Sequence, residues 1–558
     1  MSSYSAKSAT RRGSVVPPLA GVDRPTIETV PETCDVLICG TGLVESVLAA
    51  ALAWQGTNVL HIDANSFYGD TSACLNMKEL QHWLNDVANG ADNLNMNAQL
   101  YVPRPMDTKR YLVDLAPHIL FAKSDMLDVL IKSRVFKYLE FKPLGQFHTY
   151  QRDSFEKVSG NKQEIFTDQT LSATTKRNLM KFIKFIAEWK IDEEMYKSLG
   201  GVPADEFMSA KFKLEEQQIT ELVVAIGLCD TIHVPASLAL TRIRRYLLSL
   251  DIYGHFPVLY SMYGSGGELA QGFCRSAAVA GATYKLGVQL TAFDESSNIA
   301  TLSDGSRVQV AEKVFLSPSQ PSPVRPLRSV QLADQHTTRL VAVVSNECKE
   351  WFAEHESAAV VVFPPGTLAG DNEQAVHTVV YGPGSGQVPA GYSCWYLSTN
   401  EKDLVRARKD LGDALERLEA SILRESTTDF DLGPLSENDV AFRPDGTPVV
   451  SSVRLGQSMQ NFVPKQKLQY LFKLGYTQAS SGSPCEPKPL QGFKTVLEVP
   501  PQLNEISYDG MVEQARKLYE AVVGSDDDFF DVDFEDEDAE EEATPAPADD
   551  DQMMPMDL

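Results

Sequence analysis

The chain has 558 residues, of which 43% are apolar, so it is long enough to form two packed domains with a large core. Its formal net charge of −26 argues against nucleic acid or a bare anionic membrane as the main partner. No apolar stretch reaches the roughly 18 to 20 residues that a membrane span needs. The eight cysteines contain no CxxC pair and no Cys/His cluster, so we expect a cytoplasmic protein without a metal site.

The two ends of the chain differ in composition from the rest. Residues 1–32 are rich in Ser, Arg and Pro and have no apolar helical face, which favours a disordered N-terminal tail. Residues 526–551 contain 15 acids and no bases. We therefore expect residues 526–558 to form an acidic, disordered tail, with attraction of a basic partner as its alternative role.

The ordered chain is expected to begin at Thr33. CDVLICGTG is typical of a buried strand that enters a glycine turn, and a helix from Leu43 to Gln55 and a second strand, NVLHID, follow it. This is the β-α-β beginning of a dinucleotide-binding fold.

Helical periodicity dominates the next part of the chain. Apolar residues recur at three- and four-residue spacing in DMLDVLIKSRVFKYL, KRNLMKFIKFIAEWK, ITELVVAIGL and SLALTRIRRYLLSLDIYG. Between them, FKPLGQFHTYQRDSFEKV has the pattern of strands in a second sheet. After Tyr253 the pattern returns to α/β, with a helix near Leu269–Ala280, the strands TYKLGVQLTAF and RVQVAEKVFLS, a helix near Asp403–Arg424 and a final helix, DGMVEQARKLYEAVVG.

These elements predict an α/β (α+β) fold with a discontinuous sheet domain and a smaller inserted helical domain. The sheet domain is expected to comprise residues 33–118 and 230–525, with additional strands near 139–167. Residues 119–229 are expected to form the mostly helical domain.

The glycine turn departs from a working dinucleotide fingerprint. Gly40, Gly42 and Asp63 stand at their expected places, but Glu45 occupies the third glycine position, where its charge would lie beside a bound pyrophosphate. We therefore interpret the turn as retained for folding and expect no cofactor. The segment after VAEKVFLS, SPSQPSPVRP, also lacks the small glycine-containing turn typical of a flavoenzyme.

Several long motifs together resemble the superfamily of Rab GDP-dissociation inhibitors and Rab escort proteins. The resemblance covers about Cys34 to Phe530 and is thin between Leu316 and Asn461. It is carried by CGTGLVESVLAAALAWQGTNVLHIDANSFYGD, YLVDLAPHILFAKSDMLDVLIKSRVFKYLEFK, YGHFPVLYSMYGSGGELAQGFCRSAAVAGATYKL and DGMVEQARKLYEAVVGSDDDFF.

The resemblance implies a sheet domain, related to flavin monooxygenases, that binds GDP-bound Rab GTPases. The residues matching the Rab-binding positions are Tyr68, Glu268, Arg275, Thr283 and Lys285. The chain departs from the family pattern at Phe67, which replaces a tyrosine, and at Lys285, where the inhibitors commonly carry methionine. YGSGGELAQ has one extra residue, and Ala270 stands in place of proline, so the loop before Glu268 is expected to be displaced.

The resemblance also implies that the helical domain handles the prenyl chain and contacts a transferase. Candidate groove residues are Phe182, Phe185, Ile186, Val223 and Ile226, and candidate transferase contacts are Phe207 and Phe212. Ordinary helix–helix packing is the alternative for each of these apolar side chains.

The sequence is compatible with three functions. The first is a non-catalytic escort protein that presents GDP-bound, unprenylated Rab to the Rab geranylgeranyl transferase heterodimer and carries the geranylgeranylated product to membranes by transient contact. The length of the chain, VESVLAAA and the QGFCR block favour it. The second is an inhibitor that recycles prenylated Rab, and the third is a flavin-dependent oxidoreductase. The sequence contains no nucleophile elbow and no P-loop.

Overall fold

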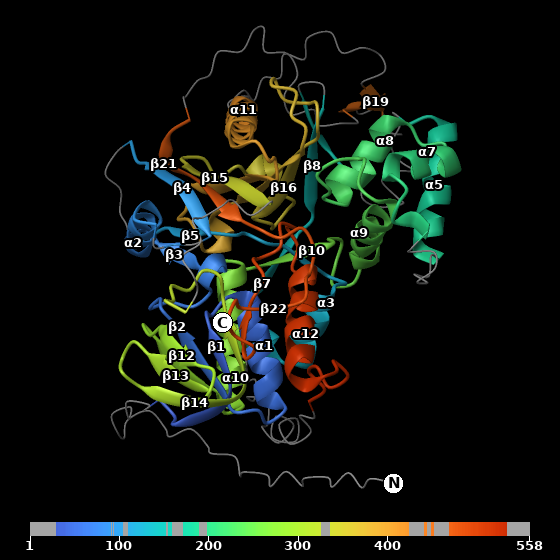
Figure 1. Ribbon diagram of the computed structural model, residues 1–558. Helices are drawn as coiled ribbons and strands as arrows, with labels where there is room; N and C mark the ends of the chain where they lie inside the picture. Colours follow the sequence, from blue (N-terminus) through green and yellow to red (C-terminus); the bar gives the residue numbers. More distant parts are fainter. Residues whose placement is uncertain are drawn as a thin grey trace, which may run out of the picture.

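The computed structural model describes residues 30–90, 92, 94–103, 110–151, 154–158, 171–188, 198–324, 335–422, 440–442, 448–450 and 468–532. Within them the chain forms a mixed α/β fold built on two eight-stranded sheets, with a layer of helices beside the second sheet (Figure 1). Most of the two predicted tails lies outside the described residues.

The first sheet contains the predicted β-α-β unit, which is confirmed. β1 (Thr33–Cys39) lies between β2 (Val59–Asp63) and β14 (Arg307–Leu316), parallel to both. The remaining strands are β11 (Thr283–Leu286), β12 (Leu290–Asp294), β13 (Ile299–Leu302), β22 (Lys488–Pro489) and β23 (Val496–Glu498). β11 forms one edge of the sheet and pairs in parallel with β2.

Three helices pack together against the first sheet. α1 (Leu43–Trp54) contacts both α10 (Gly266–Val279) and α12 (Asp509–Val523). Every residue of α1 from Leu43 to Ala53 is buried, as expected for a helix that is apolar on all sides. The predicted helices near 269–280 and 509–524 are thus present with small shifts in their bounds.

The second sheet is mostly antiparallel and has the strand order β4-β21-β15-β18-β17-β16-β8-β9. Its strands are β4 (Asn95–Tyr101), β8 (Gln146–Gln151), β9 (Ser154–Lys157), β15 (His336–Val344), β16 (Ala358–Phe363), β17 (Val376–Tyr381), β18 (Ser393–Thr399) and β21 (Tyr470–Ala479). α11 (Leu404–Ile422) packs on its central strands and α2 (Met77–Ala88) on the edge strand β4. β8 and β9 confirm the strands expected within FKPLGQFHTYQRDSFEKV.

Short strands and helices join the two sheets. β6 (Leu120–Phe121), β10 (Val258–Ser261) and β7 (Phe141–Leu144) form a three-stranded sheet, and β3 (Cys74–Asn76) pairs with β5 (Leu112–Asp114). β19 (Val440–Phe442) pairs with β20 (Pro448–Val450). The 3-10 helices are η1 (Asp70–Ser72), η2 (Val135–Tyr138), η4 (Lys349–Trp351) and η5 (Pro383–Ser385).

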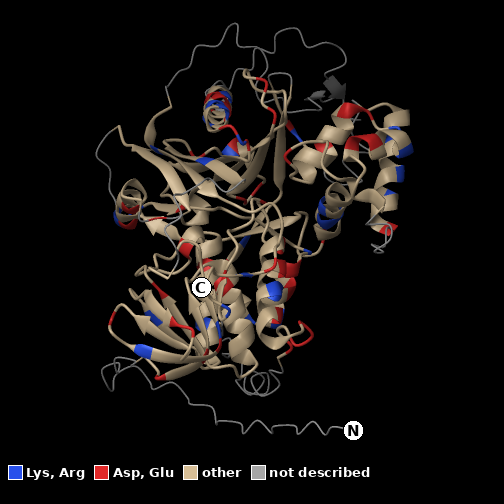
Figure 2. Cartoon of the chain, in the orientation of Figure 1, with Lys and Arg blue, Asp and Glu red and all other residues tan. Residues whose placement is uncertain are grey.

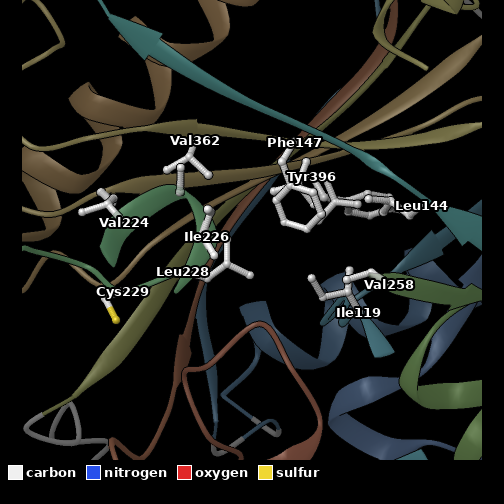
Figure 3. Close-up of a cluster of buried hydrophobic side chains, with 14 of the residues drawn as sticks. Ile119, Leu144, Phe147, Val224, Ile226, Leu228, Cys229, Val258, Val362 and Tyr396 are labelled. Carbon is white, nitrogen blue, oxygen red and sulfur yellow. The ribbon is translucent and has the colours of Figure 1, made fainter. Parts of the chain in front are cut away.

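The helical layer consists of α5 (Ala173–Glu188), α7 (Ala204–Phe212), α8 (Glu216–Thr220), η3 (Glu221–Ile226) and α9 (Ala236–Ser249). η3 is a π-helix, and the Gly227 N–H donates to the Leu222 carbonyl at 2.9 Å, five residues back. Figure 3 shows Val224 and Ile226 of this segment beside Val362 of the second sheet. η3 therefore attaches the helical layer to the sheet.

Two segments pack differently from what periodicity alone suggests. DMLDVLIKSRVFKYL divides into α3 (Asp125–Lys132) and η2, because Arg134 adopts a left-handed backbone with φ of 55°. α3 contacts α12, and η2 contacts α10. α9, which follows the predicted boundary at residue 229, packs with α5 and α7.

A largely buried ion-pair cluster ties α9 to the start of α12 and the segment before it. Glu505 lies 2.7 Å from Arg245 Nη2 and 3.2 Å from Arg242 Nη2, and Asp509 lies 3.0 Å from Arg245 Nη1. Burial opposes ionisation of Glu505, but the two guanidinium groups outweigh it and lower the pKa of that carboxyl to about 2.

We predict that Glu505→Gln lowers the free energy of unfolding by roughly 3–5 kcal/mol, because it leaves two largely buried arginines without their shared partner. A carboxyl whose folded-state pKa is lowered stabilises the fold above its unfolded-state pKa and loses that effect as the pH falls toward the folded-state value. Urea unfolding at pH 7 and pH 3 should therefore show a smaller difference between mutant and parent at pH 3. An equal difference at both pH values would contradict this account.

Candidate functional site

The glycine turn lies at the carboxyl end of β1, between β2 and β14. In an open α/β sheet this is where the strand order changes direction and where a ligand usually binds. Gly40 has φ of 108°, and a Cβ there would lie 2.6 Å from Ser317 Cβ. Glycine is therefore required at this position by the approach of the chain's own backbone.

Asp63, the expected ribose-binding acid, is directed into the turn. Its Oδ2 accepts hydrogen bonds from the Thr41 backbone N–H at 2.7 Å and from Thr41 Oγ1 at 2.6 Å. Its Oδ1 accepts from the Asn65 N–H at 2.8 Å and from Gln320 Nε2 at 3.0 Å. The carboxylate is thus occupied by groups of the chain itself.

Glu45 is buried and folds back over the turn. A Cβ at Gly42 would lie 2.5 Å from Glu45 Oε2, so the carboxyl group occupies the space directly above that glycine. Burial raises the pKa of Glu45 to about 7, although hydrogen bonds from its own backbone N–H and from Ser317 act in the opposite direction.

Asp70 completes a cluster of three buried acids. It accepts hydrogen bonds from Ser319, from Ser317 Oγ at 3.3 Å and from Gln320 Nε2 at 3.4 Å. Burial, followed by the charges of Asp63 and Glu45, raises the pKa of Asp70 well above its usual value. The segment 317–320 that supplies these donors is the one where the sequence lacks the flavoenzyme turn.

A flavin dinucleotide does not fit these residues. The pyrophosphate would have to lie at the N-terminus of α1, where Glu45 covers Gly42 and where Asp63 and Asp70 add further acidic groups. Ser317 and Gln320 fill the space beside Gly40. The turn is closed by the chain's own polar side chains.

The five residues predicted to bind Rab lie on three neighbouring segments, which are loop 64–69, α10 and β11. Glu268 and Arg275 lie on α10, with Glu268 half-buried and Arg275 exposed. Burial raises the pKa of Glu268. Tyr68 is in the loop that contacts the start of α10, since a Cβ at Gly69 would lie 2.9 Å from Gly267 Cα.

Thr283 and Lys285 occupy alternate positions of the edge strand β11, so their side chains point to the same side of the sheet. Tyr284 lies between them and its ring centroid is 6.2 Å from that of Tyr68. Tyr284 thus faces Tyr68 and α10, whereas Thr283 and Lys285 point to the other side of the strand. The role of loop 64–69, α10 and β11 in Rab binding stays a prediction.

A buried link connects β11 to the closed turn. His61 Nε2 lies 2.6 Å from the Gly40 carbonyl, and its Nδ1 lies 3.2 Å from the Tyr284 hydroxyl. Burial lowers the pKa of His61 to about 4, so the imidazole is neutral at physiological pH and can donate to Gly40 while accepting from Tyr284.

The loop before Glu268 is fixed by contacts that the sequence did not reveal. The Ser265 N–H donates to Asp114 Oδ2 at 2.7 Å, and the Ser265 hydroxyl donates to the same oxygen. Gly264 has φ of 149°, and a Cβ there would lie 2.6 Å from Cys74 Cβ. The extra residue of YGSGGELAQ is thus accommodated by a tightly packed turn before α10.

Comparison with known proteins identifies the family. A model described as GDP dissociation inhibitor matches residues 30–371. The Rab proteins geranylgeranyltransferase component A of Saccharomyces cerevisiae is 49% identical over 548 residues, covering 94% of this chain and 89% of that protein. Its namesake in Candida albicans is 42% identical, covering 91% and 87%. The chain belongs to the GDP dissociation inhibitor family.

Solved structures agree with this fold. The Rab GDI of Plasmodium falciparum has a TM-score of 0.59 at 19% identity and covers 88% of this chain and 99% of its own. An oxidoreductase of Methanosarcina mazei has a TM-score of 0.51 at 12% identity, covering 87% and 99%. This family member thus shares its architecture with an oxidoreductase, while the closed turn distinguishes it from a flavin-binding chain.

The predicted prenyl-groove residues lie in two parts of the helical layer. Phe182, Phe185 and Ile186 belong to α5, whereas Val223 and Ile226 belong to η3. All except the half-buried Phe185 are fully buried. A lipid chain would therefore have to displace packed side chains, and the groove stays a prediction.

The predicted transferase contacts form an aromatic cluster at α7. The ring centroid of Phe212 lies 5.2 Å from those of Phe182 and Phe185, and that of Phe207 lies 6.0 Å from Phe212. Lys211 Nζ lies 4.1 Å from the Phe185 ring centroid. Phe212 is buried and Phe207 is half-buried, so Phe207 is the more accessible of the two, and its contact with a transferase stays a prediction.

The described part of the chain has no metal-binding cluster and no membrane-spanning helix. It contains no group of three His, Cys, Asp or Glu side chains arranged to hold a metal, and none of its helices is long and apolar enough to cross a membrane. All eight cysteines are free thiols.

Glu45→Gln should make the stability of the fold less dependent on pH. A carboxyl whose folded-state pKa is raised favours folding at low pH, and this contribution declines as the pH rises from its unfolded-state value toward about 7. We expect the mutant to exceed the parent in unfolding free energy by on the order of 1–3 kcal/mol at pH 8, with the difference shrinking toward pH 5. Chemical denaturation at both pH values tests this, and a mutant that is less stable at pH 8 would contradict it.

Proposed function

We propose that this chain is a Rab escort protein, which binds GDP-bound, unprenylated Rab GTPases and presents them to the Rab geranylgeranyl transferase heterodimer. The observation that carries the proposal is the 49% identity over 94% of the chain to a protein named as component A of that transferase. Loop 64–69, α10 and β11 carry the proposed Rab-binding surface. No residue of the chain needs to perform chemistry in this role.

The closed turn supports a binding role over a flavin-dependent one. Glu45, Asp63 and Asp70 occupy the region where the fold would hold a pyrophosphate. The exposed Arg275 and half-buried Glu268 present opposite charges at two positions of one helix. Such a pair can set the register of a folded partner through complementary charges.

The helical layer is proposed to meet the transferase and to shelter the geranylgeranyl group carried by Rab. Its apolar core between α5, α7 and α9 would bind the lipid by burying methylene groups, each contributing about 0.8 kcal/mol. Transient contact with a membrane at delivery belongs to the same proposal.

The surface of the helical layer carries both signs of charge. Basic side chains gather along α5, and acidic side chains lie on and beside α8 (Figure 2).

The test is a reconstituted prenyl transfer with GDP-loaded Rab, geranylgeranyl diphosphate and the catalytic heterodimer, with and without the full chain. Transfer that depends on the chain is the expected result. Rab binding without any support of transfer would instead favour an inhibitor that recycles prenylated Rab, and extraction of prenylated Rab from vesicles would then be measured.

Arg275→Glu is expected to weaken binding of GDP-loaded Rab by about tenfold or more, which corresponds to roughly 1.4 kcal/mol. The matched control is Arg307→Glu, the same charge reversal at an exposed position of β14, outside the proposed surface. The affinity of Arg307→Glu for GDP-loaded Rab should stay within about twofold of the parent's affinity, because an exposed charge outside the binding surface contributes little. Titration calorimetry compares the two, and equal losses would argue for a general charge effect.

Phe207→Ala is expected to reduce prenyl transfer while leaving Rab affinity unchanged, because the half-buried ring of Phe207 is the more accessible one at α7. Phe212→Ala should instead lower the free energy of unfolding by about 3–5 kcal/mol, since this ring is only 7% exposed. Transfer rates, Rab affinity and urea unfolding separate the two effects. Full transfer activity of Phe207→Ala would remove this residue from the transferase interface.

A further inference from the structure

An exposed basic and aromatic surface lies beside α10. It is formed by the end of α3, by η2 and by one side of α10, and we call it the α10–η2 face. Its members are Ile131, Lys132, Phe136, Lys137, Tyr138 and Arg275.

The α10–η2 face is continuous. η2 packs closely on α10, because a Cβ at Gly272 would lie 2.9 Å from Val135 Cγ1. The Arg275 guanidinium carbon lies 4.5 Å from the Tyr138 ring centroid, which joins the helix to η2 by a cation–π contact. Ile131, Phe136 and Tyr138 are 48%, 42% and 40% exposed, although they are large apolar side chains.

The charge of this face is opposite to that of the chain as a whole. Residues 131–142 contain four bases, Lys132, Arg134, Lys137 and Lys142, against the single acid Glu140. Arg275 adds a further positive charge beside them. In a chain with a net charge of −26, such a concentration of bases attracts acidic segments.

The described chain ends beside α10. Phe529 and Phe530 are 3% and 2% exposed, and the Phe530 ring centroid lies 6.1 Å from that of Phe273 on α10, two residues before Arg275. Gln55 Nε2 donates to the Asp528 carbonyl at 2.7 Å and to the Asp531 carbonyl at 3.3 Å. The start of the acidic tail is therefore anchored against α1 and α10.

Residues 533–558 have the complementary composition. They contain twelve acids and no bases, with eight of the acids between residues 533 and 542, and they include the aromatic Phe534. For any chain of 26 residues the random-coil relation gives an end-to-end distance of roughly 28 Å. The α10–η2 face thus lies within easy reach of the tail.

We propose that the acidic segment 533–558 binds the α10–η2 face of its own chain. The acidic side chains would meet Lys132, Lys137 and Arg275, and Phe534 would pack on the exposed rings of Phe136 and Tyr138. Because the segment is covalently tethered near the surface, its effective concentration is in the mM range, so a dissociation constant of about 1 mM is sufficient for substantial occupancy. The contact weakens with salt, as exposed charge pairs do.

The consequence rests on the proposed function. A Rab that uses Arg275 must displace the tail. Only the fraction of the protein whose tail is undocked can bind Rab, and the apparent affinity for Rab is reduced in proportion to that fraction. The acidic tail would in this way compete with Rab for the surface that contains Arg275.

The first test is zero-length carboxyl-to-amine cross-linking of the full chain, with the linked peptides identified by mass spectrometry. We expect the carboxylates of 533–542 to couple to Lys132, Lys137 and Lys142. The yield of these cross-links should fall by at least about threefold in roughly 0.5 M salt, because salt screens the attraction between exposed charges. The matched control is the basic surface of α5, whose Lys181 and Lys184 lie in the separate helical layer (Figures 1 and 2). Coupling that reaches these two lysines as readily as the α10–η2 face would overturn the proposal.

A second measurement uses a full-length variant in which the eight acids of residues 533–542 become Asn or Gln. We expect it to bind GDP-loaded Rab about three- to tenfold more tightly than the parent at low salt. Lys132→Gln with Lys137→Gln should lower the coupling of the acidic segment to the remaining Lys142, because the variant removes two of the charges that hold the segment on the face. Cross-links at the predicted lysines together with unchanged Rab affinity would leave the docking intact and would count against the use of Arg275 by Rab.

Discussion

Closure of the glycine turn by buried carboxyl groups is the constraint on which the first sheet depends. Asp63 accepts four hydrogen bonds from Thr41, Asn65 and Gln320, and this holds the ends of β1 and β2 and the segment after β14 together. In a dinucleotide-binding protein the ligand would occupy this position and satisfy the same backbone groups. Here the chain provides its own acceptors. The result is three acids in one buried cluster, where burial raises the pKa of each.

This closure also organises the surface above it. His61, held neutral by burial, bridges the Gly40 carbonyl and the Tyr284 hydroxyl, and Tyr284 in turn contacts Tyr68. Loop 64–69 packs directly on the start of α10, so the residues of the proposed Rab surface are positioned by the same core that excludes a flavin. A fold shared with oxidoreductases can therefore serve protein binding once its ligand site is filled by side chains.

The helical layer is joined to the sheets by two kinds of contact. η3 packs its apolar side chains on the second sheet (Figure 3), and Glu505 pairs with Arg242 and Arg245 of α9. The η3 contact is nonpolar and tolerates small shifts. The ion pairs instead hold charges in a largely buried position, where the loss of one partner destabilises the fold. The proposed transferase contacts and three of the proposed lipid-binding residues lie on α5 and α7, whereas Val223 and Ile226 belong to η3 itself. Rearrangement there does not require the ion pairs to break.

The sequence by itself determined the α/β class, the β-α-β unit and the special character of Glu45, because these follow from local periodicity and from one residue in a fixed motif. It also placed Glu268 and Arg275 on one helix, since their spacing is local. Only the tertiary structure decided that Asp70, Ser319 and Gln320 fill the turn, that Asp114 holds the loop before Glu268, and that Phe530 packs on α10. These contacts join residues that are distant along the chain, and local patterning contains no information on which distant side chains meet. The π-helix of η3 and the break at Arg134 were likewise hidden, because apolar spacing at three and four residues is shared by α-helices and by segments that tertiary packing distorts.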